Sequence, residues 1–197
     1  MTAREKIGHW LFRNRSFTPV PFALAVLVFA RPTAASMVGG GLLVVLGELV
    51  RLWAVSLTGS ETRTTGSVGG SRLVTAGPYA YVRNPLYLGN IAIYVGLGVM
   101  SLALFPWLTI AGWLWFQMQY SLIIEAEERH LGVVFAESYE RYRSEVPRFL
   151  PRLTPYRAQG EPAEELNVRA GLRSERSGLI AVGVMAALLI LRMALHQ

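Results

Sequence analysis

The sequence predicts an all-α, polytopic membrane protein with about five transmembrane helices in a single domain. Hydrophobic residues make up 52% of the 197 residues, charged residues only 16%, and the mean hydropathy is +0.36. This composition is more apolar than that of an ordinary soluble domain. The apolar residues form long runs that are separated by proline, glycine or charged residues, which is the pattern of successive membrane-spanning helices.

Charge and residue types exclude several kinds of site. The formal net charge of +6 comes almost entirely from arginine, which in a membrane protein marks cytoplasmic loops beside anionic lipid. We therefore expect membrane lipids, and no nucleic acid, as partners. The chain has no cysteine, so disulfides, thiolate nucleophiles and cysteine-ligated metals are excluded. Its histidines, His9, His130 and His196, lie far apart, and we expect no metal site. The sequence leaves the oligomeric state open.

Residues 1–57 are expected to form an amphipathic segment followed by a helical hairpin. In residues 1–16 basic residues alternate with apolar and aromatic ones, which suits a segment lying on the cytoplasmic membrane surface. The apolar run 17–30 is short for a span, which needs ~20 residues. The run 36–57 is long enough, and residues 31–35 would form the tight turn between the two.

The second run contains an ionisable pair and a glycine cluster. Glu48 and Arg51 are three residues apart and so lie on one helix face. Ionisable groups inside a span are functional candidates, but here we expect a mutually neutralising pair that stabilises helix packing. Residues 39–41 are all glycine, and no strand precedes them, so close helix packing is favoured over a phosphate loop.

Residues 58–153 are expected to form the catalytic core, which begins with a polar loop and the turn-rich stretch 73–87. Gly77 suits a backbone position with φ > 0. Asn84 and Pro85 read as a helix start, in which the Asn84 side chain accepts from free backbone N–H groups. The polar side chains here are Tyr79, Tyr81, Arg83 and Tyr87. They fit either a binding site for a polar molecule or an interfacial anchor.

Two further spans are expected at 85–104 and 106–124. Ala92 and Gly96 form a small-xxx-small pair that favours tight helix contact. The second of these spans continues into a charged helix that Pro147 should stop.

Neighbouring glutamates follow the last of these spans. Helical periodicity places four residues on one apolar stripe, namely Ile124, Glu128, Leu131 and Phe135. Glu127 lies beside the stripe. An unpaired carboxylate on an inward face is costly, so Glu128 needs either a protein cation such as Arg83 or a cationic ligand. The residues leave both partners open.

The remaining segments are a cytoplasmic linker over 154–176 and a C-terminal transmembrane helix over 177–197. Positive charges number four in residues 1–16, three in 58–84 and nine in 125–176. The opposite side holds only Arg31 and Arg192. The positive-inside rule then places the N-terminus and both candidate site segments in the cytoplasm.

Four motifs occur at fixed spacing within residues 46–153. They read Leu73-Val-Thr-x-Gly-Pro-Tyr79, Arg83-Asn-Pro-x-Tyr-x-Gly89, Glu127-Glu128-x-x-Leu131-x-x-x-Phe135-x-x-x-Tyr139-x-x-Tyr142, and Val146-Pro-Arg-Phe-Leu-Pro151. In order and spacing they resemble the isoprenylcysteine carboxyl methyltransferase and phospholipid methyltransferase superfamily. The N-terminal segment and the last span lie outside the resemblance.

The resemblance implies an integral membrane enzyme that uses S-adenosyl-L-methionine. It places the cofactor against Leu73, Val74, Gly77, Tyr79, Asn84, Pro85, Leu86, Tyr87, Glu127 and Glu128. Arg83, Asn84 and Glu128 are the catalytic residues that it implies. Many relatives have histidine at the position of Asn84. The prenylcysteine branch has arginine where this chain has Ile123, a departure that weakens the case for a prenylcysteine carboxylate as substrate.

Methyl transfer to an amphiphilic acceptor is the favoured function, with an isoprenoid, a lipid head group or a small apolar molecule as candidates. The reaction is an in-line displacement that depends mainly on alignment of donor and acceptor. One alternative is an NADPH-dependent membrane reductase, in which Arg63, Arg72 and Arg83 would bind the cofactor phosphates. The other is a non-catalytic membrane scaffold, with the tyrosines as anchors and the glutamates in salt bridges.

Overall fold

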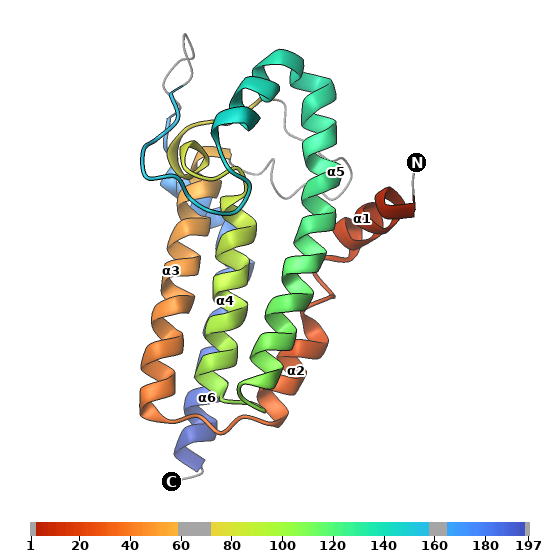
Figure 1. Ribbon diagram of the computed structural model, residues 1–197. Coiled ribbons are helices and arrows are strands. Elements are labelled where there is room, and N and C mark those ends of the chain that lie inside the picture. Colours follow the sequence, from red (N-terminus) through yellow and green to blue (C-terminus); the bar gives the residue numbers. More distant parts are fainter. Residues whose placement is uncertain (1–2, 59–71, 158–164, 196–197) are drawn as a thin grey trace.

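The computed structural model describes residues 3–58, 72–157 and 165–195, and within them the chain is helical without any strand. The elements are α1 (Ala3–Asn14), α2 (Val20–Val28), α3 (Ala34–Thr58), the 3₁₀ helix η2 (Gly77–Ala80), α4 (Pro85–Ser101), α5 (Trp107–Glu145) and α6 (Val168–Leu195). Figure 1 shows a bundle of long helices, with α3 and α4 side by side. The all-α prediction is confirmed.

Helices α3 and α4 make the tightest contact of the bundle. A Cβ atom at Gly40 would collide with the backbone of Gly96 and Met100, and one at Gly47 would lie 2.7 Å from the carbonyl oxygen of Gly89. Gly39 and Gly41 have no such neighbour within 4 Å. The predicted close packing is therefore confirmed for Gly40 and wrong for the glycines on either side of it.

The first two apolar runs form α2 and α3, which are joined by residues 29–33, and their crossing of the membrane as a hairpin stays a prediction. Helix α2 has nine residues, about 13 Å at 1.5 Å per residue, far less than the ~30 Å hydrocarbon core. Helix α2 packs against α4 and α6, and the Phe22 ring makes edge contacts with Tyr94 and Phe116. Pro19 caps the helix, and proline disfavours its extension toward the N-terminus.

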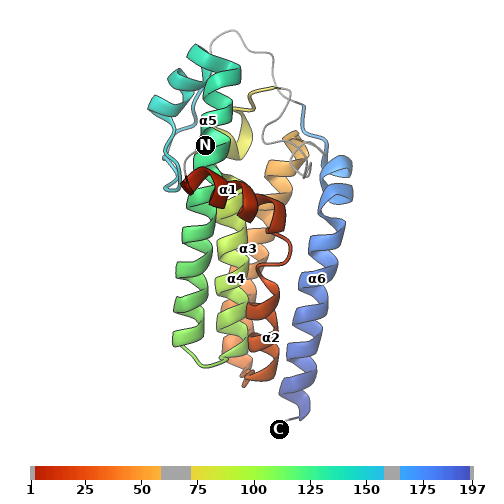
Figure 2. The same cartoon turned by 90° about the vertical axis from the view of Figure 1, so that its right-hand side faces the viewer.

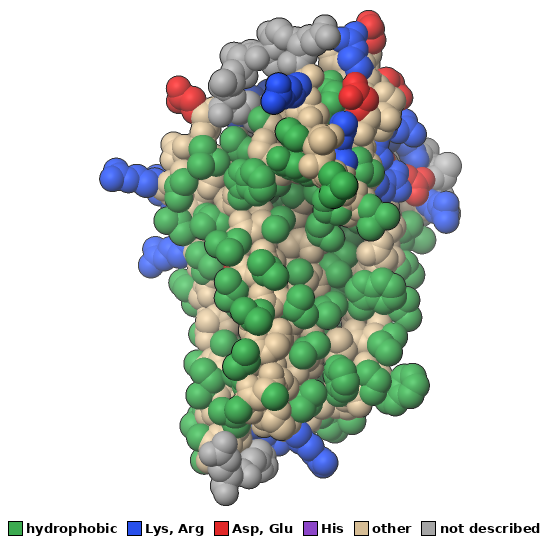
Figure 3. All heavy atoms as spheres, turned by 60° about the vertical axis from the view of Figure 1, so that its left-hand side comes forward, with side chains coloured by type: hydrophobic (Ala, Val, Ile, Leu, Met, Phe, Trp, Pro, Cys, Tyr) green, Lys and Arg blue, Asp and Glu red, His purple; other side chains and the backbone are tan. Residues whose placement is uncertain are grey.

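Two helices, α3 and α6, are long and apolar enough to cross a membrane, and α4 is a shorter apolar helix. Most residues of the apolar windows in α3 and α6 are not buried, unlike those of a core helix in a soluble protein. Figure 3 shows apolar side chains covering the length of the bundle, with charged side chains gathered toward its ends. The described parts of the chain thus contain two candidate membrane spans, and the number of crossings remains a prediction.

Helix α5 bends at Ala136, where φ is 43° and ψ is −116°. Beyond the bend the helix folds back over the end of the bundle that carries η2 (Figure 1). It ends at Glu145, two residues before Pro147, as predicted. The bend is what brings the segment that follows it back to the turn-rich stretch 73–87.

The predicted linker 154–176 is wrong in its last nine residues, because α6 begins at Val168. Glu175 in α6 is buried, with 1% exposure, and Arg51 Nη2 lies 2.6 Å from its Oε2 atom. Arg51 also donates to Asn90 in α4. The expected pairing of Arg51 with Glu48 is replaced by contacts between helices, because Arg51 reaches both α4 and α6. The polar loop over 59–71, including Arg63, lies outside the described residues.

Candidate active site

The turn before α4 takes the backbone conformation that the sequence predicts. Gly77 has φ = +57°, and η2 follows directly. A Cβ atom at Gly77 would overlap the Leu57 side chain and lie 3.1 Å from Trp53 Nε1. Glycine is therefore required both for its conformation and for the close approach of η2 to α3.

Helix α4 begins at Pro85 after Asn84, as predicted, but Asn84 does not cap it through its side chain. The Asn84 Nδ2 group instead donates to the carbonyl oxygen of Arg148, at 3.3 Å. The predicted capping contact is wrong because the returning segment after α5 offers this carbonyl to the amide. Asn84 thus links the start of α4 to residues more than 60 positions later.

Backbone hydrogen bonds hold the segment after α5 against the turn-rich stretch. Arg83 N donates to Pro147 O at 2.9 Å, Arg152 N to Tyr81 O at 3.0 Å, and Tyr156 N to Ala80 O at 2.9 Å. The Tyr142 hydroxyl donates to Tyr79 O at 2.8 Å. The turn-rich stretch 73–87 and the segment after α5 are far apart in sequence, yet together they form one wall of the candidate site.

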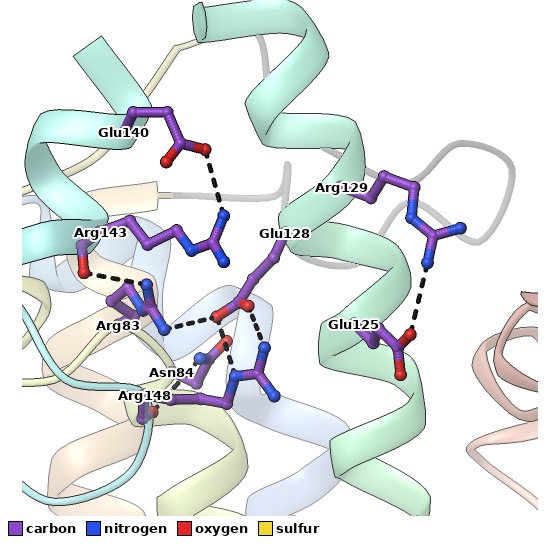
Figure 4. A network of polar contacts seen from close by, with 8 residues as sticks. All are labelled: Arg83, Asn84, Glu125, Glu128, Arg129, Glu140, Arg143 and Arg148. Atoms are coloured by element: carbon purple, nitrogen blue, oxygen red, sulfur yellow. Dashed lines mark hydrogen bonds and ion pairs between the residues drawn. The ribbon is translucent and has the colours of Figure 1, made fainter. Parts of the chain in front are cut away.

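Glu128 is held by arginines from both pieces (Figure 4). Arg83 Nη2 and Arg148 Nε each lie 3.2 Å from Glu128 Oε1, and Arg148 Nη2 contacts Oε2. Glu128 is 8% exposed. Hydrogen bonding to Glu128 raises the pKa of Arg148, which favours the charged guanidinium. Of the two partners that the sequence leaves open, the structure shows a protein cation.

Arg148 is a site residue that the sequence did not single out. It lies in the Val146–Pro151 motif, but its role depends on the fold-back of α5. The inward carboxylate of Glu128 was the available signal, because a buried charge requires a partner. Glu125, by contrast, makes an exposed pair with Arg129 at 3.4 Å, as periodicity predicts.

Glu127 has a different partner from its neighbour. Its Oε1 atom accepts a hydrogen bond from the Tyr87 hydroxyl at 2.8 Å. The Tyr87 ring packs against the ring of Tyr120, with centroids 4.7 Å apart. Burial raises the pKa of the Glu127 carboxyl to about 7, the Tyr87 hydrogen bond and the Arg15 guanidinium oppose the rise, and Glu128 adds to it. Glu127 therefore changes charge near neutral pH.

These groups fit a cationic ligand that also carries polar groups. The Glu127 carboxylate is hydrogen-bonded to a neutral hydroxyl, and aromatic rings lie beside it, both of which favour a cation. The buried Tyr139 hydroxyl and Arg83 Nε have no hydrogen-bond partner within the described parts of the chain. They are available to polar groups of a ligand. Tyr139 belongs to the third motif and was not assigned a role from the sequence.

The other expected cofactor residues lie around the same end of the bundle. Leu73 packs against the buried cluster of Tyr139, Tyr142 and Val146. Pro85 is buried. Val74, Tyr79 and Leu86 are partly buried. The structure thus gathers Leu73, Tyr79, Arg83 and Asn84 around the fold-back, while Tyr87 faces Glu127.

An apolar cleft of about 410 Å³ opens between α4 and α5. Its lining residues are Leu88, Ile91, Ala92, Val95, Thr109, Ile110 and Trp113. Ala92, which was expected at a helix contact like Gly96, lines this cleft. Leu88, which lines the cleft, directly follows Tyr87 in α4. Ile110 and Trp113 are more than 40% exposed, so the cleft opens to the surface of the bundle.

The sequence model of the phospholipid methyltransferase family matches residues 35–138, which is more than half of the chain. The chain belongs to the phospholipid methyltransferase family. The matched region runs from α3 to just beyond the bend of α5 and includes Arg83, Glu127 and Glu128. Helices α1, α2 and α6 lie outside it. The predicted superfamily is confirmed.

Curated relatives agree with the family. The chain is 34% identical over 166 residues to the cobalt-zinc-cadmium resistance protein CzcN of Cupriavidus metallidurans, covering 79% of this chain and 68% of that protein. It is 38% identical over 79 residues to protein-S-isoprenylcysteine O-methyltransferase of Schizosaccharomyces pombe, covering 40% and 33%. It is 30% identical over 73 residues to methanethiol S-methyltransferase of Crocosphaera subtropica, covering 37% and 27%.

The chain therefore spans no more than about a third of the length of these two named methyltransferases. No solved structure matches the chain. Together the family and the relatives identify a membrane methyltransferase.

Proposed function

We propose that this protein transfers a methyl group from S-adenosyl-L-methionine to a lipid-like acceptor at the membrane. The observation that carries the proposal is the Tyr87–Glu127 pair. A partly buried carboxylate whose pKa is about 7 and whose hydrogen-bond partner is neutral gains stability when a cation binds beside it. S-adenosyl-L-methionine supplies a methyl group on a cationic sulfur.

Each part of the site has a separate task in this proposal. Glu127 binds the cationic part of the cofactor, and Tyr87 orients the carboxylate. Glu128 is already neutralised by two arginines, so its task is to hold the returning segment in place. The wall that binds the adenosine and methionine parts is formed by Leu73, Val74, Gly77, Tyr79, Asn84, Pro85 and Leu86. The Tyr139 hydroxyl and Arg83 Nε add hydrogen bonds.

The apolar cleft between α4 and α5 is the proposed path for the acceptor. Burying the apolar part of the acceptor in this cleft would stabilise the complex by about 25 cal/mol for each Å² of apolar surface removed from water. The reacting atom of the acceptor would lie toward Tyr87. Ile123, which stands where the prenylcysteine branch has arginine, is fully buried in the core around Phe116 and Tyr120. We therefore propose an acceptor without a carboxylate beside the reacting atom.

The structure offers little to the reductase alternative. Arg83 pairs with Glu128, and Arg72 donates to the carbonyl oxygen of Leu57 at 2.6 Å. The charge of Arg83 is thus already paired with a carboxylate, one Arg72 N–H group is already used by a carbonyl, and Arg63 lies outside the described residues. The cytoplasmic placement of the site and of the N-terminus remains part of our proposal. It is supported by the positive charges in residues 1–16, 58–84 and 125–176.

The deciding experiment measures binding and transfer on the purified full-length protein. We expect calorimetry to show binding of S-adenosyl-L-methionine and not of NADPH. We also expect radiolabel from the cofactor methyl group to enter a lipid extract incubated with the protein. Binding of NADPH alone would support the reductase instead, and binding of neither cofactor would support the scaffold.

A further inference from the structure

Helix α1, which lies outside the matched family region, has two faces of different character. One face is bound to α5: a Cβ atom at Gly8 would lie 2.7 Å from Leu122 O, and Leu11 and Phe12 are buried with Ile123. The expectation that this segment lies on the membrane surface stays a prediction, with Leu11 and Phe12 facing protein and Ile7 and Trp10 exposed. The opposite face is the one left exposed.

The exposed face of α1 is basic and aromatic. Lys6, His9, Trp10, Arg13 and Asn14 line an open hollow of about 520 Å³. Residues at spacings of three, four and seven lie on one side of a helix, so these groups converge, and Trp10 is 60% exposed. Two fixed positive charges beside an indole ring are the groups that recognise an anionic headgroup at a membrane interface.

The position of α1 favours a lipid over a soluble anion. Figure 2 shows α1 lying across the bundle rather than along it, toward the end that carries the bend of α5. A helix that lies in the plane of the membrane surface presents its outer face to the lipid headgroups. Ile7, next to Lys6, is 50% exposed and is available to acyl chains. Charge and apolar surface are thus placed side by side, as in a phospholipid.

We propose that the outer face of α1, formed by Lys6, His9, Trp10, Arg13 and Asn14, binds an anionic phospholipid of the membrane, and that this lipid holds α1 against α5.

The lipid would act on the methyl-transfer site through the C-terminal end of α1. Phe12 packs in the same cluster as Tyr120 and Ile123, and the Arg15 guanidinium lies 4.0 Å above the Phe12 ring. Arg15 Nη1 also donates to Phe12 O at 3.0 Å. Arg15 is close enough to Glu127 to oppose the rise in its pKa. This second step rests on the proposed function, whereas the lipid site itself does not.

Native mass spectrometry of the full-length protein in detergent tests the lipid site, with phosphatidylglycerol and phosphatidylcholine as probes. We expect phosphatidylglycerol to bind more tightly. In the double variant K6Q/R13Q its affinity should fall about 30-fold, at roughly 1 kcal/mol for each charge. The control R141Q/R143Q removes two exposed arginines beyond the bend of α5 and should keep the preference. Equal binding of both lipids, or equal losses in both variants, would overturn the lipid site.

Cofactor affinity in nanodiscs tests the coupling. We expect S-adenosyl-L-methionine to bind several-fold more tightly in discs with phosphatidylglycerol than in pure phosphatidylcholine, and K6Q/R13Q to remove the difference. The same affinity in both discs would overturn the coupling. Cofactor binding in neither disc, with the lipid preference intact, would contradict the proposed function and not the lipid site.

Discussion

Glu127 and Glu128 are neighbours on α5, yet they face different surroundings. Glu128 points toward the fold-back, where arginines from two segments neutralise it. Glu127 points toward the start of α4, where it meets the hydroxyl of Tyr87. The same chemical group is thus neutralised by two arginines in one position, whereas in the next position we propose that it binds the cationic cofactor. What distinguishes them is the charge of the partner that the fold supplies.

The largest expected effect comes from Glu128→Gln, which leaves Arg83 with a buried, uncompensated charge. We expect the free energy of unfolding to fall by about 3 kcal/mol. Most of this loss comes from Arg83, because the Arg148 side chain is 37% exposed and water can solvate its charge. Unfolding in detergent, followed by circular dichroism, measures this. The control Glu125→Gln removes an exposed pair and should cost at most about 0.5 kcal/mol. Equal losses would contradict the proposal that Glu128 holds the returning segment in place.

Glu127→Gln should separate ligand binding from stability. We expect the affinity for S-adenosyl-L-methionine to fall by about 2 kcal/mol, or roughly 30-fold, because a charge-assisted contact is lost. The midpoint of unfolding should stay near that of the parent protein. Calorimetry and a thermal scan on the same preparation give both numbers. A variant that unfolds early but binds normally would reverse the roles of the two glutamates.

The pH dependence of binding follows from the raised pKa of Glu127, which is about 7. Only the ionised carboxylate attracts a cation, so affinity should be full above this value and fall as the pH drops through it. The limiting slope is about tenfold per pH unit. Titrations between pH 5.5 and 8.5 should show this decline in the parent protein and a flat profile in Glu127→Gln. A decline that survives the substitution would assign the titration to another group.

Tyr87→Phe should have the smallest effect on affinity, about 1 kcal/mol, since it removes one hydrogen bond and keeps the ring. It should also shift the midpoint of the pH profile upward, because the Tyr87 hydrogen bond opposes the rise in the pKa of Glu127. The direction of this shift can be read from the same titrations. A downward shift would show that Tyr87 does not donate to Glu127 in the free protein.

Local rules predicted the parts of the site that depend on a few neighbouring residues. The positive φ of Gly77, the start of α4 at Pro85 and the end of α5 before Pro147 follow from backbone chemistry alone. The need of Glu128 for a cation followed from its place on the apolar stripe. In each case the sequence carries the cause within one or two helical turns.

The parts that could not be predicted depend on the bend at Ala136. A non-glycine residue with φ of 43° has no local signal, and without the bend Arg148 would lie far from Glu128. Glu175 was missed for a related reason: it was assigned to a polar linker, and its burial depends on Arg51 of another helix. Side-chain partners across helices are set by tertiary packing, which periodicity within one segment does not specify.

The backbone bonds that join the returning segment to the turn-rich stretch have a practical consequence. Because Arg152 and Tyr156 bond through their N–H groups, every amino acid except proline supplies the same donor at these two positions. Replacing Arg152 by any residue other than proline therefore keeps this backbone hydrogen bond and removes only side-chain contacts with Glu145, whereas the Tyr156 ring also packs against Tyr142 and would be lost from the buried cluster.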